Sequence, residues 1–552
     1  MENIQKVSYT EAVPTYKLLE GSDVMKIIKD SDFLMGWDVL YLSCAWATVF
    51  QSPKFVIQWY SLYHNVYEPI LVYAESQGSL TGLITLANRK DGGPIMAAGR
   101  TDAHYQVWVS EEKNKESFIR EALLLLRKKF PKEEILLENL PPDAPIEWLE
   151  SDPNWTDCCT IKPITRPLIE LNEDTINQLL KKQQFRQNRN RLKRQGDPQL
   201  VNVTDEKQFE SILDELATDY DFRQGAIYNR TPFKSNPLKK DFFKILFREK
   251  LLIVTVLTLN DEIIASLISI MGLNGYVHGA GINSQSPHYA KLSPGFLNMI
   301  LFAEELYKGG FKVLDLTTGG QSYKSRLAST SDFVYTFSFS PRTNKLLTRK
   351  SMLRIEEYLK KGLTQVNINP KELREQINRK RILSKEKLGL IRKQGLSAFS
   401  NFSVRGRNVR QLYEIGSDNN PESGKIAGSI NENAVRDLMN FEPEGLTTQW
   451  EFLQDSLRRV ERGEIPYTWM HNEQLLACIW LKSSAGEEEK ENSGPVNILQ
   501  GLYIRNHLRA ELGNFLASVK AVASISHPDR KIYFAEGGAL KIEYRNLNRV
   551  YL

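Results

Sequence analysis

The sequence predicts an α/β protein in which mixed, mostly antiparallel sheets are flanked by helices. The first observation is that apolar runs of strand length occur in pairs around short turns, which is typical of antiparallel hairpins. The second is that each hairpin is followed by a helix with an apolar stripe and by a further strand-like run. The third is that this order recurs in residues 1–165, in 166–345 and, more weakly, in 401–552. The chain is therefore predicted to use one structural unit three times.

In residues 1–165, a helix is predicted to begin at Pro53. Proline suits the first turn of a helix because it has no backbone N–H to leave unpaired, and Ser52 suits the cap before it. The elements that follow are a hairpin at 69–87 with its turn at 77–79, a helix at 115–130 and a strand at 134–140. Residues 1–30 are predicted to be a leader with one short strand.

Residues 166–345 repeat this order and begin with a basic helix at 174–195. Phe185 and Leu192 lie seven residues apart on this helix, so we expect both to face the core. The basic residues that share another face are Lys182, Arg186, Arg189 and Lys193. The elements that follow are a helix at 209–220, a hairpin at 251–272 that turns at Asn260 and Asp261, a strand at 275–281, a helix at 294–306 and a strand at 311–317.

The third block is predicted at 401–552, after a basic helical linker at 346–400. Pro370 is a natural break within this linker because proline ends a preceding helix. The third block contains a helix at 448–460, a hairpin-like run at 475–484, a polar loop at 486–494, a strand at 496–504, a helix at 511–525 and a strand at 531–537. Because its motifs are weaker, this block is predicted to be degenerate and to serve packing or partner binding. The alternative is a second donor site at Arg505, Arg509 and Gly513, which precede the helix as an eroded phosphate loop would.

Basic charge is concentrated in two segments, although the formal net charge of the 552-residue chain is only +5. Residues 181–194 carry seven Lys and Arg side chains and no acid, and residues 345–393 carry fifteen against five Glu. We therefore expect anionic contacts at defined places rather than a surface that coats nucleic acid. No DNA partner is predicted.

Several classes of protein are disfavoured by the composition. Apolar residues make up 41% of the chain, and no apolar run reaches the length of a membrane-spanning helix. The N-terminus lacks the apolar stretch of a secretory signal. The four cysteines and seven histidines show no metal-ligand spacing. We therefore expect a cytoplasmic protein with reduced thiols, without a membrane span and without a metal.

The most specific motifs lie near the end of the second block. There Ser293, Pro294 and Gly295 open a helix, the next strand ends in Asp315, and a loop follows with Gly319, Gly320, Tyr323 and Lys324. Three further motifs precede these along the chain, in the order in which the family named below has them. They are 50–53 (FQSP), 99–105 (GRTDAHY) and the basic stretch 185–196. Together these motifs resemble the CelD/BcsL-like acetyltransferases, a family of the GNAT superfamily that is related to Fem-type ligases.

The resemblance implies a tandem of GNAT-like domains and a third, degenerate one. It also implies transfer of an acyl group, with acetyl as the expected group, from acyl-CoA to an amine or hydroxyl. The acceptor expected from the family is a small molecule or glycan, such as a cell-envelope or polysaccharide precursor. The usual GNAT loop Arg/Gln-x-x-Gly-x-Gly/Ala is absent from the first two blocks, and Gln321-Ser322 replaces the acid that usually precedes Tyr-Lys.

Two alternative functions remain open at this stage. A Fem-like ligase would take its donor from aminoacyl-tRNA, and the basic helix and basic linker favour this reading because tRNA binding needs spread phosphate contacts. A non-catalytic GNAT scaffold is favoured by the missing loop acid and by the extra third block. The fold alone does not decide between these functions.

The start of the helix at 294–306 is the predicted donor site. The first backbone N–H groups of a helix, here those of Gly295, Phe296 and Leu297, have no acceptor within the helix itself, and the helix dipole attracts phosphate. Lys291 adds positive charge just before them, and Ser293 is placed to cap the helix. The alternative is an ordinary capped helix start without a ligand.

Proton transfer is assigned to three residues near the same place. His278 lies on the strand before the donor helix, where a GNAT strand opens beside the thioester, and a histidine titrates near neutral pH. Asp315 ends the following strand. Tyr323 is predicted to protonate the leaving thiolate, by resemblance to other GNAT enzymes, and Lys324 is predicted to hold a phosphate. The alternatives are a packed histidine and an acid that caps a turn.

Six further residues are predicted to bind the acceptor or another anionic part of the substrates. Within the basic helix they are Arg189 and Arg194, which would clamp a negative group unless this is simply a solvated helix. The resemblance adds Asp221 and Arg223 from the DFRQG segment at 221–225, and Asp102 and Tyr105 from the first block.

Overall fold

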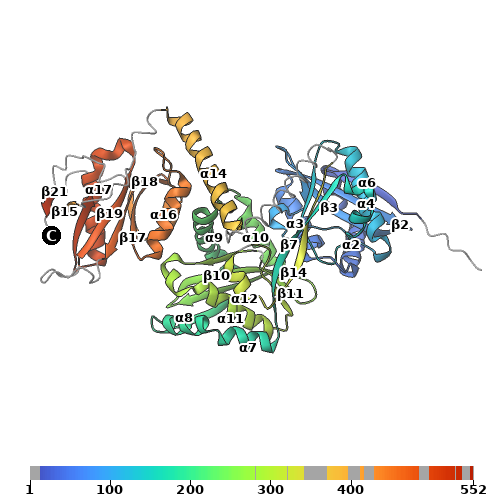
Figure 1. Ribbon diagram of the computed structural model, residues 1–552, viewed down its shortest axis with the longest axis horizontal. Coiled ribbons are helices and arrows are strands. Elements are labelled where there is room, and N and C mark those ends of the chain that lie inside the picture. The colour runs from blue at the N-terminus through green and yellow to red at the C-terminus, as the bar shows by residue number, and fades with distance from the viewer. Residues whose placement is uncertain are drawn as a thin grey trace, which may run out of the picture. The chain divides into compact units, whose positions relative to one another are not determined.

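The chain forms two compact units, which are described separately. The computed structural model describes residues 13–279, 281–319, 321–340, 370–395, 411–415, 428–483, 496–528, 530–536 and 547–550. The first unit contains the described parts of 1–213, 237–283 and 295–366, and the second contains 214–236, 284–294 and the described parts of 367–552. Figure 1 colours the elements from blue at the N-terminus to red at the C-terminus.

The first unit is built on a 14-stranded sheet. Its strands are β1 (Thr15–Glu20), β2 (Tyr67–Ser76), β3 (Ser79–Arg89), β4 (Ile95–Ala97), β5 (Val109–Ser110), β6 (Ile135–Leu140), β7 (Cys159–Glu170), β8 (Pro198–Val203), β9 (Leu252–Leu259), β10 (Glu262–Met271), β11 (Tyr276–His278), β12 (Asn283–Gln285), β13 (Val313–Asp315) and β14 (Thr330–Phe339). The main order is β1-β2-β3-β4-β6-β14-β7-β13-β11-β10-β9-β8. Along this order the pairs are antiparallel, except that β4–β6 and β11–β13 are parallel.

The helices of this unit follow the predicted positions for the most part. They are α1 (Ser22–Ile27), α2 (Ser31–Ser43), α3 (Pro53–Tyr63), α4 (Lys115–Lys129), α5 (Trp148–Ser151), α6 (Pro153–Thr156), α7 (Glu173–Lys181), α8 (Gln183–Lys193), α10 (Leu238–Arg248), α11 (Pro294–Lys308) and α12 (Ser322–Leu327). α9 (Glu206–Tyr228) contains residues of both units. The Ser52 side chain caps α3 by accepting from the Phe55 N–H at 3.2 Å, as predicted.

The two blocks of this unit exchange their last strands. The long strand β7 closes the first block in sequence, yet it pairs with β13 of the second block. β14 closes the second block and pairs with β6 of the first. β14 pairs with β7 over its whole length, from Thr330↔Leu168 to Phe339↔Cys159. The exchange joins both blocks into one sheet, so a single hydrogen-bonded scaffold positions residues from both.

Two predictions of local structure need correction. The basic helix predicted at 174–195 is two helices, α7 and α8, because the backbone of Lys182 is extended with ψ 130°. The face assignment within it is confirmed, since Phe185 and Leu192 are both 1% exposed. β7 and β14 were not predicted at all. β7 contains Pro163 and Pro167, and proline argues against a central strand because it has no N–H to donate.

The second unit contains a seven-stranded sheet of order β16-β17-β18-β19-β20-β15-β21. Its elements are α14 (Pro370–Gln394), β15 (Gln411–Ile415), β16 (Ser429–Glu432), α15 (Val435–Leu438), α16 (Gln449–Glu461), β17 (Ile465–His471), β18 (Gln474–Ser483), β19 (Val496–Ile504), α17 (Leu512–Ser526), β20 (Lys531–Glu536) and β21 (Leu547–Val550). β19 and β20 are parallel, and α17 lies between them in sequence. The same parallel pair with an intervening helix occurs as β4–α4–β6 and β11–α11–β13, so the predicted unit is present three times.

A segment from the second block is part of this second unit. Phe222 and Ala226 of α9 belong to its apolar core together with Leu453 and Leu457 of α16. The Trp450 indole N–H also donates to the Ala226 carbonyl at 3.0 Å. The predicted polar loop at 486–494 and most of the linker at 346–400 lie outside the described residues, and α14 begins at Pro370.

The α/β class with mixed, mostly antiparallel sheets is confirmed. None of the helices in the described parts of the chain combines the length and the apolar composition that crossing a bilayer requires. The four cysteines are free thiols. The predicted domain limits at 165, 345 and 400 stay predictions.

Candidate functional site

The sheet opens in the second block directly after His278 and Asp315. β11 and β13 pair in parallel up to these two residues. The chain after β11 then bonds to β10, because the Ile282 carbonyl accepts from Ile268 at 2.8 Å. The chain after β13 bonds instead to β7 through the N–H of Leu316. Two strands that run side by side therefore part at this point.

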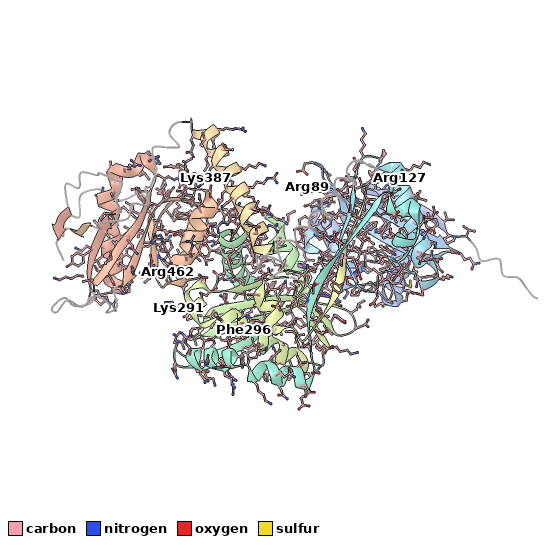
Figure 2. The ribbon with its side chains drawn as sticks, in the orientation of Figure 1. Arg89, Arg127, Lys291, Phe296, Lys387 and Arg462 are labelled. Carbon is pink, nitrogen blue, oxygen red and sulfur yellow. The ribbon has the colours of Figure 1, made fainter. Side chains whose placement is uncertain are left out.

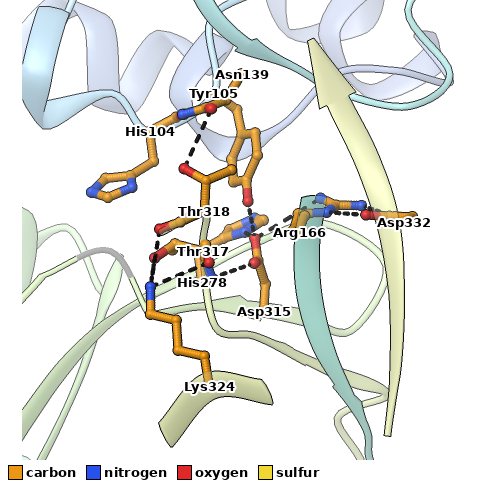
Figure 3. Close-up of polar contacts among 10 residues, drawn as sticks. All are labelled: His104, Tyr105, Asn139, Arg166, His278, Asp315, Thr317, Thr318, Lys324 and Asp332. Carbon is orange, nitrogen blue, oxygen red and sulfur yellow. Dashed lines mark hydrogen bonds and ion pairs between the residues drawn. The ribbon is translucent and has the colours of Figure 1, made fainter. Parts of the chain in front are cut away.

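Asp315 is the centre of a buried polar cluster at this opening (Figure 3). Its carboxylate accepts from the Tyr105 hydroxyl at 2.5 Å and from the Thr317 backbone N–H at 2.7 Å, and Nδ1 of His278 lies 2.8 Å from it. The Arg166 guanidinium approaches the same carboxylate to 3.9 Å. Tyr105, His278 and Asp315 are 1%, 3% and 0% exposed, so the cluster is shielded from water. The sequence predicted all three residues as functional but did not predict that they contact one another.

The cluster keeps Asp315 ionised. Burial alone would raise the pKa of the Asp315 carboxyl, but the hydrogen bond and charge of His278, with Arg166 and Tyr105, hold it below its usual value. Burial and the Asp315 charge raise the pKa of Tyr105 well above its usual value, so this hydroxyl keeps its proton. The Tyr105 hydroxyl therefore acts here as a hydrogen-bond donor.

Arg166 ties the exchanged strands to this cluster. It lies on β7 and is 5% exposed, and its guanidinium forms a two-point bond to the carboxylate of Asp332 on β14, at 2.8 and 2.5 Å. The guanidinium also lies 5.4 Å from the centre of the Tyr105 ring. A buried arginine between two carboxylates balances charge that would otherwise be costly to bury. No sequence motif singles out Arg166 or Asp332, because neither strand is predicted.

Lys324 holds the loop that follows β13. Its ammonium group donates to the Thr317 carbonyl at 3.2 Å, the Thr317 hydroxyl at 3.0 Å and the Thr318 carbonyl at 3.0 Å. Thr317 has a φ of +61°, a conformation that needs such support. Burial lowers the pKa of Lys324 to about 8. An ammonium group has three N–H donors, so these contacts use the capacity that the predicted phosphate contact would need.

Tyr323 lies one residue before Lys324 on α12 and is partly exposed. Its hydroxyl accepts from the side-chain amide of Asn283 at 3.0 Å. Gly320 of the same predicted motif lies outside the described residues, and Gly319 has a φ of +135° that suits glycine. The role of Tyr323 as a proton donor stays a prediction.

The predicted donor residues fall in both units. Gly295, Phe296 and Leu297 open α11 in the first unit, where Phe296 packs under the Arg326 guanidinium at 5.6 Å. Lys291 and Ser293 belong to the second unit. Figure 2 shows Lys291 beside Arg462. The Lys291 ammonium group donates a hydrogen bond to the Arg462 carbonyl at 3.5 Å. Ser293 has a left-handed backbone with φ 50°.

The basic residues of α8 are exposed, as an anion clamp requires. Arg189 and Arg194 are both exposed. The Arg189 guanidinium lies 5.9 Å from the centre of the buried Phe185 ring. Their exposure fits both the predicted clamp and a solvated helix, so their role stays a prediction.

Asp221 is held by hydrogen bonds from backbone groups of the second unit. It is 2% exposed, and its carboxylate accepts from the backbone N–H groups of Phe233 and Lys234 at 3.0 and 2.6 Å. It thereby fixes the turn after α9. Arg223, two residues further on, is partly exposed. The predicted acceptor contacts of Asp221 and Arg223 stay predictions.

Asp102 anchors a first-block loop to the second block. It forms an ion pair with Lys239 of α10 and accepts from the Trp59 indole N–H at 3.4 Å. The loop continues to His104, which sequence reasoning missed because it looked like one of seven scattered histidines. His104 is partly exposed, whereas Tyr105 next to it is buried. Among the residues that the structure describes, no group of three or more His, Cys, Asp or Glu is placed to hold a metal ion.

A family model described as the acetyltransferase (GNAT) domain matches residues 181–325. The match covers the opened strands, α11 and Lys324. This part of the chain is thus similar to a GNAT-type domain. The finer assignment to the CelD/BcsL-like family stays a prediction. No curated protein sequence matches the chain.

Three of the solved structures that are similar to parts of this chain are the following. FemX is 8% identical, with a TM-score of 0.40, and the match covers 57% of this chain and 97% of FemX. A tandem GNAT protein from the clavulanic acid biosynthesis pathway is 9% identical, with a TM-score of 0.36 and coverages of 59% and 98%. L-PGS from Bacillus licheniformis is 11% identical, with a TM-score of 0.36 and coverages of 54% and 95%.

Proposed function

We propose that this chain is an acyltransferase that moves an acyl group, with acetyl as the first candidate, from acyl-CoA to an amine or hydroxyl. The observation that supports it most is the parting of β11 and β13 after His278 and Asp315, inside the segment that matches the GNAT domain. In a GNAT-type domain this opening receives the thioester arm of the donor. The acceptor class favoured by the family resemblance is a sugar or envelope precursor.

The start of α11 supports a donor site beside this opening. The first backbone N–H groups of a helix attract phosphate, and Gly295 has no side chain to obstruct it. Asn298 lies one turn further on and is 0% exposed, yet both polar atoms of its amide lack a hydrogen-bond partner. Helical side chains point back toward the N-terminus. The amide groups of a pantetheine arm would form hydrogen bonds with the side-chain amide of Asn298.

The acyl-transfer reaction needs a polarised thioester carbonyl and a positioned acceptor. The lone pair of the acceptor attacks the carbonyl carbon, the C–S bond breaks, and its electron pair leaves on sulfur. The buried cluster around Asp315 fixes the ends of β11 and β13, so it holds the opening in one geometry. In this proposal Tyr323 remains the candidate that protonates the thiolate.

The test is calorimetry of acetyl-CoA binding to wild type, to Gly295→Trp and to a matched control. Gly513 is the second residue of α17, as Gly295 is of α11, and a side chain there meets nothing within 4 Å. We expect micromolar binding to wild type and to Gly513→Trp, and at least a tenfold weaker affinity for Gly295→Trp. Equal affinities for both variants would remove the donor from α11, and no binding to wild type would end the acyl-CoA proposal.

A second candidate is transfer from aminoacyl-tRNA, which the exposed basic residues of α8 and α14 favour. On α14, the exposed Arg381, Lys385 and Arg392 lie on one helix face. Binding of unacylated tRNA that weakens steeply between about 50 and 200 mM salt would support it. If wild type binds neither acetyl-CoA nor tRNA, the chain is a non-catalytic scaffold.

A further inference from the structure

The first block opens its sheet as the second block does, but fills the opening with its own chain. β4 and β6 pair in parallel at Ile95↔Ile135 and Met96↔Leu136. Beyond this point the Gln106 N–H donates to the Glu138 carbonyl at 3.1 Å, and the Gln106 side chain accepts from the Glu138 N–H at 3.2 Å. The loop at 99–106 therefore occupies the strand edge that β4 leaves. A donor arm has no such edge available in the first block.

This loop places His104 beside the opening of the second block. The His104 carbonyl accepts from the Asn139 amide at 2.9 Å, and the other atom of that amide accepts from the Thr318 hydroxyl at 3.4 Å (Figure 3). The centre of the Phe50 ring lies 6.4 Å from that of the His104 ring and 5.7 Å from that of the His278 ring, so Phe50 packs near both histidines. His104 thus comes from the first block but faces the residues of the second.

The two histidines differ in what their rings touch. His278 is 3% exposed and committed to Asp315. His104 is partly exposed, and within the described chain its ring nitrogens have no hydrogen-bond partner. An imidazole nitrogen without a hydrogen-bond partner in the protein can accept a proton from a ligand that reaches it. Of the two, only His104 meets this condition.

Burial keeps the His104 ring neutral. It lowers the pKa of His104 to about 4; the Asp315 charge opposes this, and Lys239, Lys324 and His278 add to it. The same positive surroundings disfavour an ammonium ion, so an amine would be held there in its nucleophilic, uncharged form. Attack by an uncharged amine makes an intermediate with a strongly acidic N–H, for which a weak base is sufficient.

We propose that His104 is the general base of the reaction and that the acceptor is a primary amine. This inference rests on the proposed function. The amine nitrogen forms a bond to the thioester carbon, and its surplus proton passes to a ring nitrogen of His104. The C–S bond breaks, its electron pair leaves on sulfur, and the thiolate takes up a proton. His104 then releases its proton to solvent.

The first experiment measures release of CoA thiol from acetyl-CoA with glucosamine as amine probe and glucose as hydroxyl-only probe. We expect transfer to glucosamine, a 10²- to 10⁴-fold lower kcat in His104→Gln, and an unchanged affinity for acetyl-CoA. His64→Gln is the matched control, because His64 is an exposed histidine at the end of α3. Added imidazole is expected to restore part of the rate of His104→Ala, which a structural role would not allow.

The outcomes separate the two proposals. If wild type transfers the acetyl group but His104→Gln retains its kcat, or if glucose is the better acceptor, the inference is overturned and the acyltransferase stands. If His104→Gln loses acetyl-CoA binding or thermal stability and imidazole restores nothing, His104 is only structural. Failure of wild type to bind acetyl-CoA at all contradicts the proposed function itself.

A second experiment does not depend on the choice of acceptor. Diethyl pyrocarbonate acylates neutral, accessible imidazole, and the modified histidines are identified by mass spectrometry. At pH 5 we expect His104 to react at least fivefold faster than His278, and acetyl-CoA to protect it. An unreactive His104, or one that acetyl-CoA leaves unprotected, would overturn the inference.

Discussion

The first and second blocks contain the same unit but use its opening differently. In the first, the loop at 99–106 bonds to the edge of β6 and fills the gap. In the second, β11 and β13 part after a buried cluster, and the first block supplies Tyr105 to that cluster. The first block thus fills its own opening and contributes a residue to the buried cluster of the second. The exchanged strands β7 and β14 keep the two blocks in fixed register for this purpose.

The largest effect that tests this comparison is expected for Asp315→Leu. The substitution leaves the buried Arg166 without one of its carboxylates and the His278 ring without its partner, and breaking a buried charged pair costs about 3–5 kcal/mol. We expect the free energy of unfolding in urea to fall by that amount. Asp91→Leu is the control, because the Asp91 side chain is 64% exposed and pairs with Arg89 at the surface. A loss below about 1 kcal/mol for Asp315→Leu would show that the cluster does not hold the blocks together.

Sequence patterns were sufficient for the elements whose signals are local. The hairpin turn at Asn260 and Asp261 was predicted, and both residues have the positive φ that such turns require, +51° and +65°. The candidate residues His278, Asp315 and Tyr105 were also selected from motifs. Their mutual contacts were not, since they depend on the register of β11 and β13 and on a partner 210 residues away in the chain.

The missed site residues share a physical reason. Arg166 and Asp332 face each other only because β7 and β14 are exchanged, and no local pattern encodes a pairing of strands that are 166 residues apart. His104 has no special spacing in the sequence. Its burial and its neighbouring charges exist only after the two blocks join.

A smaller effect on the free energy of unfolding is expected when the pH is lowered. Comparison with a His104 variant assigns this effect to His104. The folded-state pKa of about 4 lies below the ordinary value of 6.5, so between pH 6.5 and 4 the unfolded chain binds more protons at this site. Stability contributed by this group should therefore be full above pH 6.5 and decline as the pH falls toward 4, by about 2–3 kcal/mol at pH 4.5. The variant His104→Gln lacks this pH-dependent contribution to stability.

The measurement is the difference in unfolding free energy between wild type and His104→Gln at pH 7.0 and pH 4.5. Protonation of Asp315 and other acids affects both proteins, so the difference reports His104. We expect wild type to lose about 2–3 kcal/mol more than the variant on acidification. Equal losses would mean that the His104 ring is as well solvated in the folded protein as in the unfolded chain.

The smallest effect on stability is expected for Thr318→Val, which removes the hydroxyl that bonds Asn139 across the two blocks at 3.4 Å. A neutral hydrogen bond of this length contributes about 0.5 kcal/mol or less, so thermal unfolding should hardly change. The His104 loop nevertheless depends on Asn139, and looser placement should change the rate at which diethyl pyrocarbonate modifies His104. Thr101→Val, on the same loop but exposed, is the control. An unchanged rate in Thr318→Val would show that the first block positions His104 alone, through Asn139 and Gln106, and that the second block only receives it.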